Sequence, residues 1–75
     1  MLNKFEEFLK STCKIEESSN TSVVAVDIKY SLIISITANN RTLIAHKNNN
    51  DMRFNGIIEN VHQLKLLLQL IRKGI

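Results

Sequence analysis

The side chains best suited to chemistry are few, and they lie far apart along the sequence. The chain has one cysteine, Cys13, and two histidines, His46 and His62. A thiol nucleophile needs a base and a group that orients that base, and no recognisable motif surrounds either histidine. Cys13 instead continues the apolar side of a helical pattern, which is typical of a buried structural thiol. These residues therefore predict no nucleophilic catalysis.

The sequence also lacks the other common signatures of an active site. Its only glycines, Gly56 and Gly74, form no phosphate-binding loop. The acidic pairs at residues 6–7 and 16–17 are adjacent in the chain, which splays their carboxylates, and one cysteine with two distant histidines does not match the spacing of metal ligands. A chain of 75 residues is also too short for a deep substrate cleft. We therefore expect a protein that is not an enzyme, with no cofactor, metal or small-molecule substrate.

Length and composition bound the class of protein. The 75 residues predict a single small domain, residues 1–75, and 44% of them are hydrophobic, as in folded domains. A domain this short buries only about 60–65% of the surface that its unfolded chain exposes. Because a single cysteine excludes an internal disulfide, association as a homodimer is the stabilising device that remains. The lone thiol and the absence of a signal-peptide pattern or a membrane-spanning apolar run predict a cytoplasmic protein.

Hydrophobic spacing predicts two helices with strands between them. Helical spacing runs over residues 3–12 and again from residue 56 or 57 to residue 73. Apolar residues alternate over residues 22–38, which is too long for one straight strand, so we expect a bend or a break near Lys29–Ser31. Residues 52–54 are either a short edge strand or an anchor that returns to the core. The predicted fold is α+β: an N-terminal helix, a three-stranded antiparallel sheet whose first strand is long or bent, and a C-terminal helix on one face.

A two-residue turn at Asn39-Asn40 would set the register of the last hairpin, because asparagine tolerates the left-handed conformation that such turns need. Ile36 would then lie opposite Leu43 on the inner face. The same register points Ile33 and Ile44 outward, where they form a candidate contact surface. The alternative is that these are two scattered surface residues, which is common.

The stretch "LKLLLQLI", residues 64–71, holds more leucine than one helix face needs. A stripe at helical spacing should pack on the sheet, and it consists of Ile57, Val61, Leu64, Leu68, Ile71 and Ile75. Leu66 and Leu70 point away from this stripe and lie one turn apart. We interpret them as an interface with a second copy or with another protein, with exposed or locally covered leucines as the alternative.

A basic flank runs beside that pair, formed by His62, Lys65, Arg72 and Lys73. These side chains are candidate nucleic-acid contacts, because a basic helix flank can follow phosphates. The alternative is a solvated surface whose last-turn cations complement the helix dipole. No aromatic residues alternate with the cations, so a stacking platform for single strands is not predicted.

The predicted order of helix, three strands and helix is similar in outline to the double-stranded RNA-binding domain. That resemblance implies phosphate contacts from a glycine-rich turn and a lysine cluster at the start of the second helix. The matching stretch here, "MRFNGIIENVH" at residues 52–62, has one arginine and no lysine cluster, so the likeness is one of topology.

Two functions are therefore expected. The first is a small protein-interaction module that binds a protein partner or a second copy through Leu66, Leu70 and the Ile33/Ile44 face. Nine asparagines beside many lysines and isoleucines suggest an AT-rich genome. Such a genome fits a low-GC bacterium or one of its phages. In a phage or mobile-element setting, the expected role is to inhibit or redirect a host protein, of the anti-defence type. The alternative is a nucleic-acid-binding regulator that uses the basic flank. No membrane association is expected.

Overall fold

The computed structural model describes residues 2–74, which form two helices and five strands. The chain begins with helix α1 (Leu2–Lys10) and ends with helix α2 (Val61–Lys73). The strands between them are β1 (Lys14–Ser18), β2 (Ser22–Asp27), β3 (Leu32–Thr37), β4 (Arg41–His46) and β5 (Met52–Ile57). All neighbouring strands are antiparallel, and their order in the sheet follows the chain from β1 to β5. The fold is α+β, but the prediction of a three-stranded sheet is wrong.

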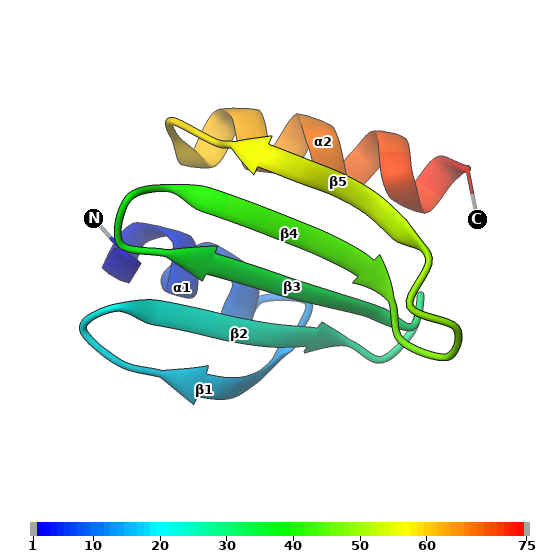
Figure 1. Cartoon of the computed structure of the whole chain (residues 1–75), viewed down its shortest axis with the longest axis horizontal. Coiled ribbons are helices and arrows are strands. Elements are labelled where there is room, and N and C mark those ends of the chain that lie inside the picture. Colours follow the sequence, from blue (N-terminus) through cyan, green and yellow to red (C-terminus); the bar gives the residue numbers. More distant parts are fainter. Residues whose placement is uncertain (1, 75) are drawn as a thin grey trace.

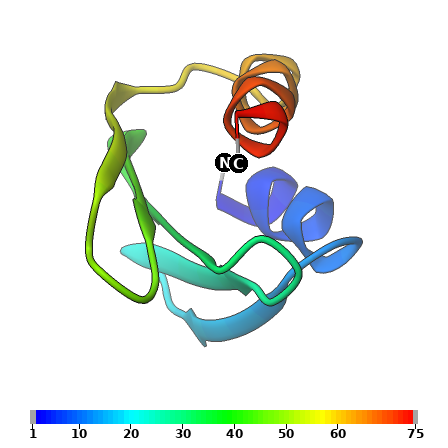
Figure 2. The same cartoon turned by 90° about the vertical axis from the view of Figure 1, so that its right-hand side faces the viewer.

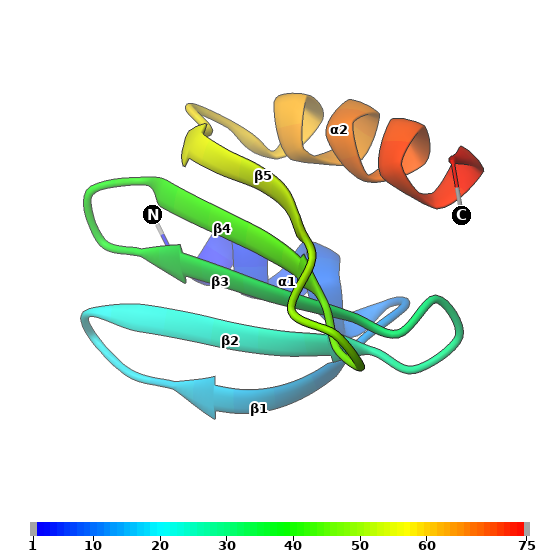
Figure 3. The same ribbon diagram turned by 45° about the vertical axis from the view of Figure 1, so that its right-hand side comes forward.

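Both helices cover the same face of the sheet (Figure 1). Figure 2 shows that the sheet curls around them, so that the helices lie side by side in its concave face. The convex face has no helix on it in the part of the chain that the structure describes (Figure 3). The five-stranded sheet also removes the likeness in outline to the double-stranded RNA-binding domain.

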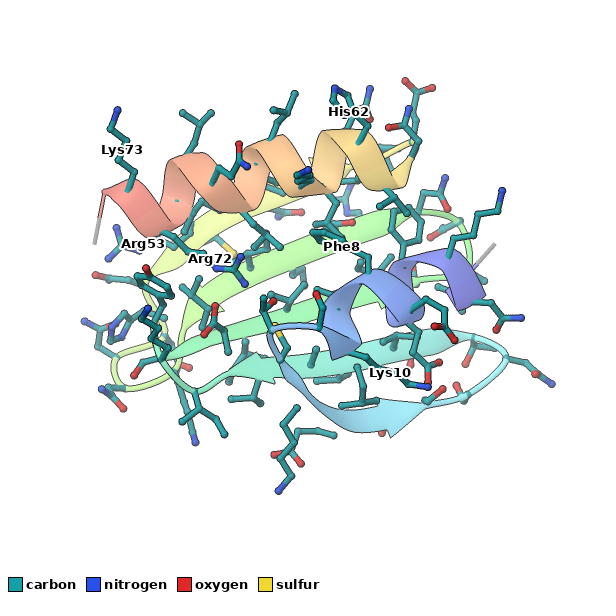
Figure 4. All side chains as sticks on the ribbon, turned by 180° about the vertical axis from the view of Figure 1, so that it is seen from behind. Phe8, Lys10, Arg53, His62, Arg72 and Lys73 are labelled. Atoms are coloured by element: carbon teal, nitrogen blue, oxygen red, sulfur yellow. The ribbon has the colours of Figure 1, made fainter. Side chains whose placement is uncertain are left out.

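The core fills the space between the concave face and the two helices. The side chains that form it are at most 5% exposed, and they include Phe5, Leu9, Val23, Ala25, Leu32, Ile34, Ile36, Ile44, Ile58, Leu64 and Leu68. Phe8 of α1 is partly buried and lies between the two helices (Figure 4). Each fully buried Leu or Ile contributes roughly 1.5–3 kcal/mol relative to an exposed position, which is how so small a chain stabilises two helices on one sheet.

The two edges of the sheet are β1, which the sequence analysis missed, and β5, which it offered as a short edge strand over residues 52–54. β1 is exposed at four of its five positions, and β5 is exposed at four of its six positions. Edge strands of this kind lack the regular alternation of apolar and polar residues that identifies a half-buried strand. Both edge strands are nevertheless paired with a neighbouring strand, and each pairing has one irregularity in its register.

The C-terminal helix starts later than expected, at Val61 and not at residue 56 or 57. Asn60 is its N-cap, and the side chain of Asn60 accepts a hydrogen bond of 2.9 Å from the backbone N–H of Gln63. Ile57, which was predicted to lie on the buried helical stripe, belongs to β5 and is 53% exposed. Ile75, the last member of that stripe, lies outside the described residues.

The predicted break at Lys29–Ser31 is confirmed, and it is a full hairpin. Asp27 pairs with Leu32, so a four-residue connection separates β2 from β3. Paired residues share a face, which means that odd positions of β2 and even positions of β3 point into the core. Val23 and Ala25 are therefore buried under the helices, although the even positions of this segment carry the apparent alternation.

The β3–β4 hairpin is shifted by one residue from the predicted register. Ile36 lies opposite Thr42, not opposite Leu43. The connection uses three residues, 38–40, because the backbone N–H of Asn40 bonds to the Thr37 carbonyl and Asn40 then adopts a φ of 67°. A shift of one residue turns every side chain of β4 to the other face.

Candidate functional site

Two leucines of α2 point away from the core, as the sequence predicted. Leu66 is 48% exposed and Leu70 is 70% exposed, whereas Leu64 and Leu68 are fully buried. Since side chains four residues apart are neighbours on a helix surface, Leu66 and Leu70 form one continuous apolar strip, called here the α2 ridge.

The side chains that flank the α2 ridge are basic or neutral. His62, Lys65 and Lys73 are all exposed, and the sequence of α2, VHQLKLLLQLIRK, contains no acidic residue. Figure 4 shows His62 and Lys73 near opposite ends of the helix, both projecting from its outer side. The α2 ridge is therefore an apolar strip with a positively charged border.

The second predicted contact surface is divided by the register shift. Ile44 lies in the core and is fully buried, so it is not part of any surface. Ile33 is half-buried and lies on the convex face of the sheet, beside Ala45 of β4. Leu43, which was expected inside, takes the outward position and is 38% exposed.

The fourth member of the basic flank, Arg72, is held by protein contacts. Its Nε donates a hydrogen bond of 2.8 Å to Oδ2 of Asp27, which is 2% exposed. Its Nη2 donates to the Thr12 hydroxyl at 3.1 Å, and its guanidinium carbon lies 5.8 Å from the centre of the Tyr30 ring. Arg72 thus ties α2 to the end of β2 and to the α1–β1 connection.

Asp27 also organises the β2–β3 hairpin. Its Oδ1 accepts a hydrogen bond of 3.1 Å from the backbone N–H of Tyr30, while its Oδ2 receives Arg72. Buried carboxylates are found where they are paired and hydrogen-bonded in this way. The apolar alternation over residues 22–38 falls on even positions, which puts Asp27 on the outward side, so the sequence analysis did not select it. The signal that could have found it is the predicted break at Lys29–Ser31, which places an aspartate immediately before a turn.

Cys13 lies beside this cluster and is half-buried. Desolvation raises the pKa of the thiol above its usual value, and the nearby Asp27 carboxylate adds to the rise, although hydrogen bonding to Thr12 and the charge of Arg72 oppose it. A raised pKa keeps the thiol protonated at neutral pH, which is the opposite of what a nucleophilic cysteine requires.

The two histidines are not brought together with the cysteine. His46 ends β4, where its Nδ1 accepts a hydrogen bond of 3.3 Å from the backbone N–H of Asn48, and His62 lies in the first turn of α2. Within residues 2–74, no group of three His, Cys, Asp or Glu side chains has a geometry that could hold a metal ion.

The sequence analysis also misplaced Ile28. The alternation placed it inside the sheet, but it lies at the tip of the β2–β3 hairpin and is 71% exposed. The hairpin tip thus adds one more exposed apolar side chain to those of α2.

In comparisons with known proteins, no family model, no curated protein and no solved structure matches the chain. Neither helix between residues 2 and 74 is long and apolar enough to cross a membrane. The surface geometry alone therefore carries the functional proposals that follow.

Proposed function

We propose that this protein is a non-enzymatic protein-interaction module that binds a protein partner through the α2 ridge. The supporting observation is the exposure of Leu66 and Leu70, at 48% and 70%, on a helix whose other face is buried in the core. An amphipathic helix that offers apolar residues at positions i and i+4 is a common means of inserting into a groove of a partner.

The basic border of the α2 ridge favours a foreign protein over a second copy. Two α2 helices packed against each other would bring lysines together without any acidic side chain from α2 to pair with them. A partner with an apolar groove and carboxylates at its rim would complement both features. The alternative occupant of the α2 ridge is a second copy of this chain. The specific role that we propose for the protein is that of a phage or mobile-element product that inhibits a host protein.

The first test is the absolute mass of the protein by light scattering over a dilution series. A monomer leaves the α2 ridge for a foreign protein, whereas a dimer that the double variant Leu66→Glu/Leu70→Glu dissociates assigns the ridge to a second copy. The replaced side chains lie outside the core, so the variant should keep its fold. Circular dichroism would verify this.

The second test compares affinity capture by three proteins: the wild type, the Leu66→Glu/Leu70→Glu variant and an Ile57→Glu control. Ile57 is similarly exposed, at 53%, but belongs to β5. The proposal requires a captured protein that the ridge variant loses and the control retains. It is wrong if the protein is monomeric and the wild type and the ridge variant capture the same set.

A further inference from the structure

Positive charge is concentrated at one end of the molecule, where four segments meet. They are the α1–β1 connection (residues 11–14), the β2–β3 hairpin (27–32), the β4–β5 loop with the start of β5 (46–53) and the end of α2 (72–74), and together they are called here the basic end. Figure 1 shows the hairpin, the loop and the end of α2 at the same end of the sheet. A hydrogen bond of 2.6 Å from the Lys47 N–H to the Ser31 carbonyl joins the loop to the hairpin, and Arg72 joins α2 to the other two segments.

The basic end holds six of the ten lysines and arginines but only two of the seven acidic residues. Its net charge is +4, which leaves −1 for the rest of a chain whose total is +3. The acidic residues are Asp27, which is buried and paired with Arg72, and Asp51, which is exposed. The outward charges are therefore Asp51 and five exposed cations: Lys14, Lys29, Lys47, Arg53 and Lys73.

A shallow hollow of about 540 Å³ lies at the border of the basic end, between the end of α1, the α1–β1 connection and the hairpin. No acidic side chain lines it, and its charged lining consists of Lys10, Lys14 and Lys29. Lys10 is the weakest contributor, because its ammonium lies 3.6 Å from the Glu6 carboxylate. Figure 4 shows that Arg53, Arg72 and Lys73 lie toward the same end of the molecule and that His62 lies toward the other.

We propose that the basic end binds the phosphate backbone of a nucleic acid without reading its sequence. Four of its five outward cations are lysines, whose compact ammonium groups bind phosphate as point charges. The molecule measures 21 × 20 Å across this end, whereas the grooves of B-DNA are about 6 and 12 Å wide. An end of this width exceeds either groove, so cations on it could contact phosphates on both sides of a groove.

The same region offers little aromatic surface on which bases could stack. Its aromatic residue, Tyr30, is partly buried and already contacts two cations, with the Lys29 ammonium 5.5 Å and the Arg72 guanidinium 5.8 Å from its ring centre. Phosphate contacts position a protein on nucleic acid but carry no sequence information. The basic end shares Lys73 with the border of the α2 ridge but contains neither Leu66 nor Leu70, so nucleic-acid binding there does not depend on the proposed protein partner.

The test is fluorescence anisotropy of a short labelled DNA duplex at increasing salt. If most of the five outward cations contact phosphates, the plot of log K against log[salt] should have a slope of about −4, since each contact contributes about −0.9. The double variant Lys29→Gln/Lys47→Gln should bind more weakly and flatten the slope by about 2 units. Both side chains are exposed loop residues, so the variant should fold normally.

The matched control is Lys4→Gln/Lys65→Gln, which removes the same charge from exposed positions outside the basic end. The proposal requires this control to keep the wild-type slope. An equal loss in both variants would assign binding to overall charge or to the flank of α2, and would overturn it. Absence of duplex binding at low salt would also overturn it and would leave an acidic protein as the partner of the basic end. The Leu66→Glu/Leu70→Glu variant should retain the lysine-dependent slope, which separates this result from failure of the proposed function.

Discussion

Replacing Arg72 with methionine should destabilise the protein strongly, because it leaves the Asp27 carboxylate buried without its cation. Removal of one partner from a buried ion pair costs about 3–5 kcal/mol. Arg72 is 17% exposed and Asp27 keeps the hydrogen bond from the Tyr30 N–H, so we expect the lower end, about 3 kcal/mol. A domain of 75 residues has a total stability of roughly 4–11 kcal/mol. The single substitution should therefore remove a large share of it.

Urea unfolding followed by circular dichroism would measure this loss. The control is Lys73→Met, which removes a neighbouring but exposed cation and should change the free energy of unfolding by less than about 0.5 kcal/mol. The double variant Asp27→Asn/Arg72→Met should recover part of the loss, because asparagine leaves no unpaired charge and still accepts the Tyr30 N–H. The reasoning is refuted if Arg72→Met costs no more than Lys73→Met, or if the double variant is as unstable as the sum of the single ones.

Two further predictions concern single residues. Because burial raises the pKa of Cys13, the unfolded chain should lose the thiol proton before the folded protein does. The free energy of unfolding should then fall as pH rises past the usual thiol value. Cys13→Ala should abolish that fall, and equal pH profiles for variant and wild type would contradict it. At Asn40, φ is 67° and the buried Oδ1 has no hydrogen-bond partner among residues 2–74. An unpaired buried acceptor destabilises the wild type by about 1–3 kcal/mol, and Asn40→Gly removes it. Glycine loses more backbone entropy on folding, which destabilises the variant by about 0.5–1 kcal/mol. The variant should therefore have a higher urea midpoint, and a lower one would show that Oδ1 is satisfied in solution.

The helices and the central strands could be predicted because their apolar residues recur at the spacing of each element. Leu66 and Leu70 follow from the same geometry, since 100° per residue places them away from Leu64 and Leu68. The outward positions of this pair are the part of the candidate site that the sequence predicted and the structure shows. The edge strands could not be predicted in this way, because their mainly exposed side chains carry no such period.

The errors in the sheet arose at its turns. An even number of residues lies between Asp27 and Leu32, so the inner face is formed by odd positions in β2 and by even positions in β3. The apolar alternation in the sequence nevertheless stays on even positions and shows no break. One additional residue in the turn before Arg41 exchanged Leu43 and Ile44 between surface and core. Turn length depends on the local conformations of single residues such as Asn40, and hydrophobic spacing does not contain that information.

The strand order has a consequence for how the chain folds. Each strand pairs with the strand next to it in sequence, so the sheet can grow by successive hairpin closures, each of which brings together segments that are already close. Chains dominated by such local pairings fold quickly. The bond between Arg72 and Asp27 joins residues 45 apart in the sequence. It should be among the last contacts to form, because α2 follows all five strands in the chain. A contact that forms after the sheet has little effect on the folding rate. The Arg72–Asp27 bond should therefore act mainly by slowing the unfolding of the native protein.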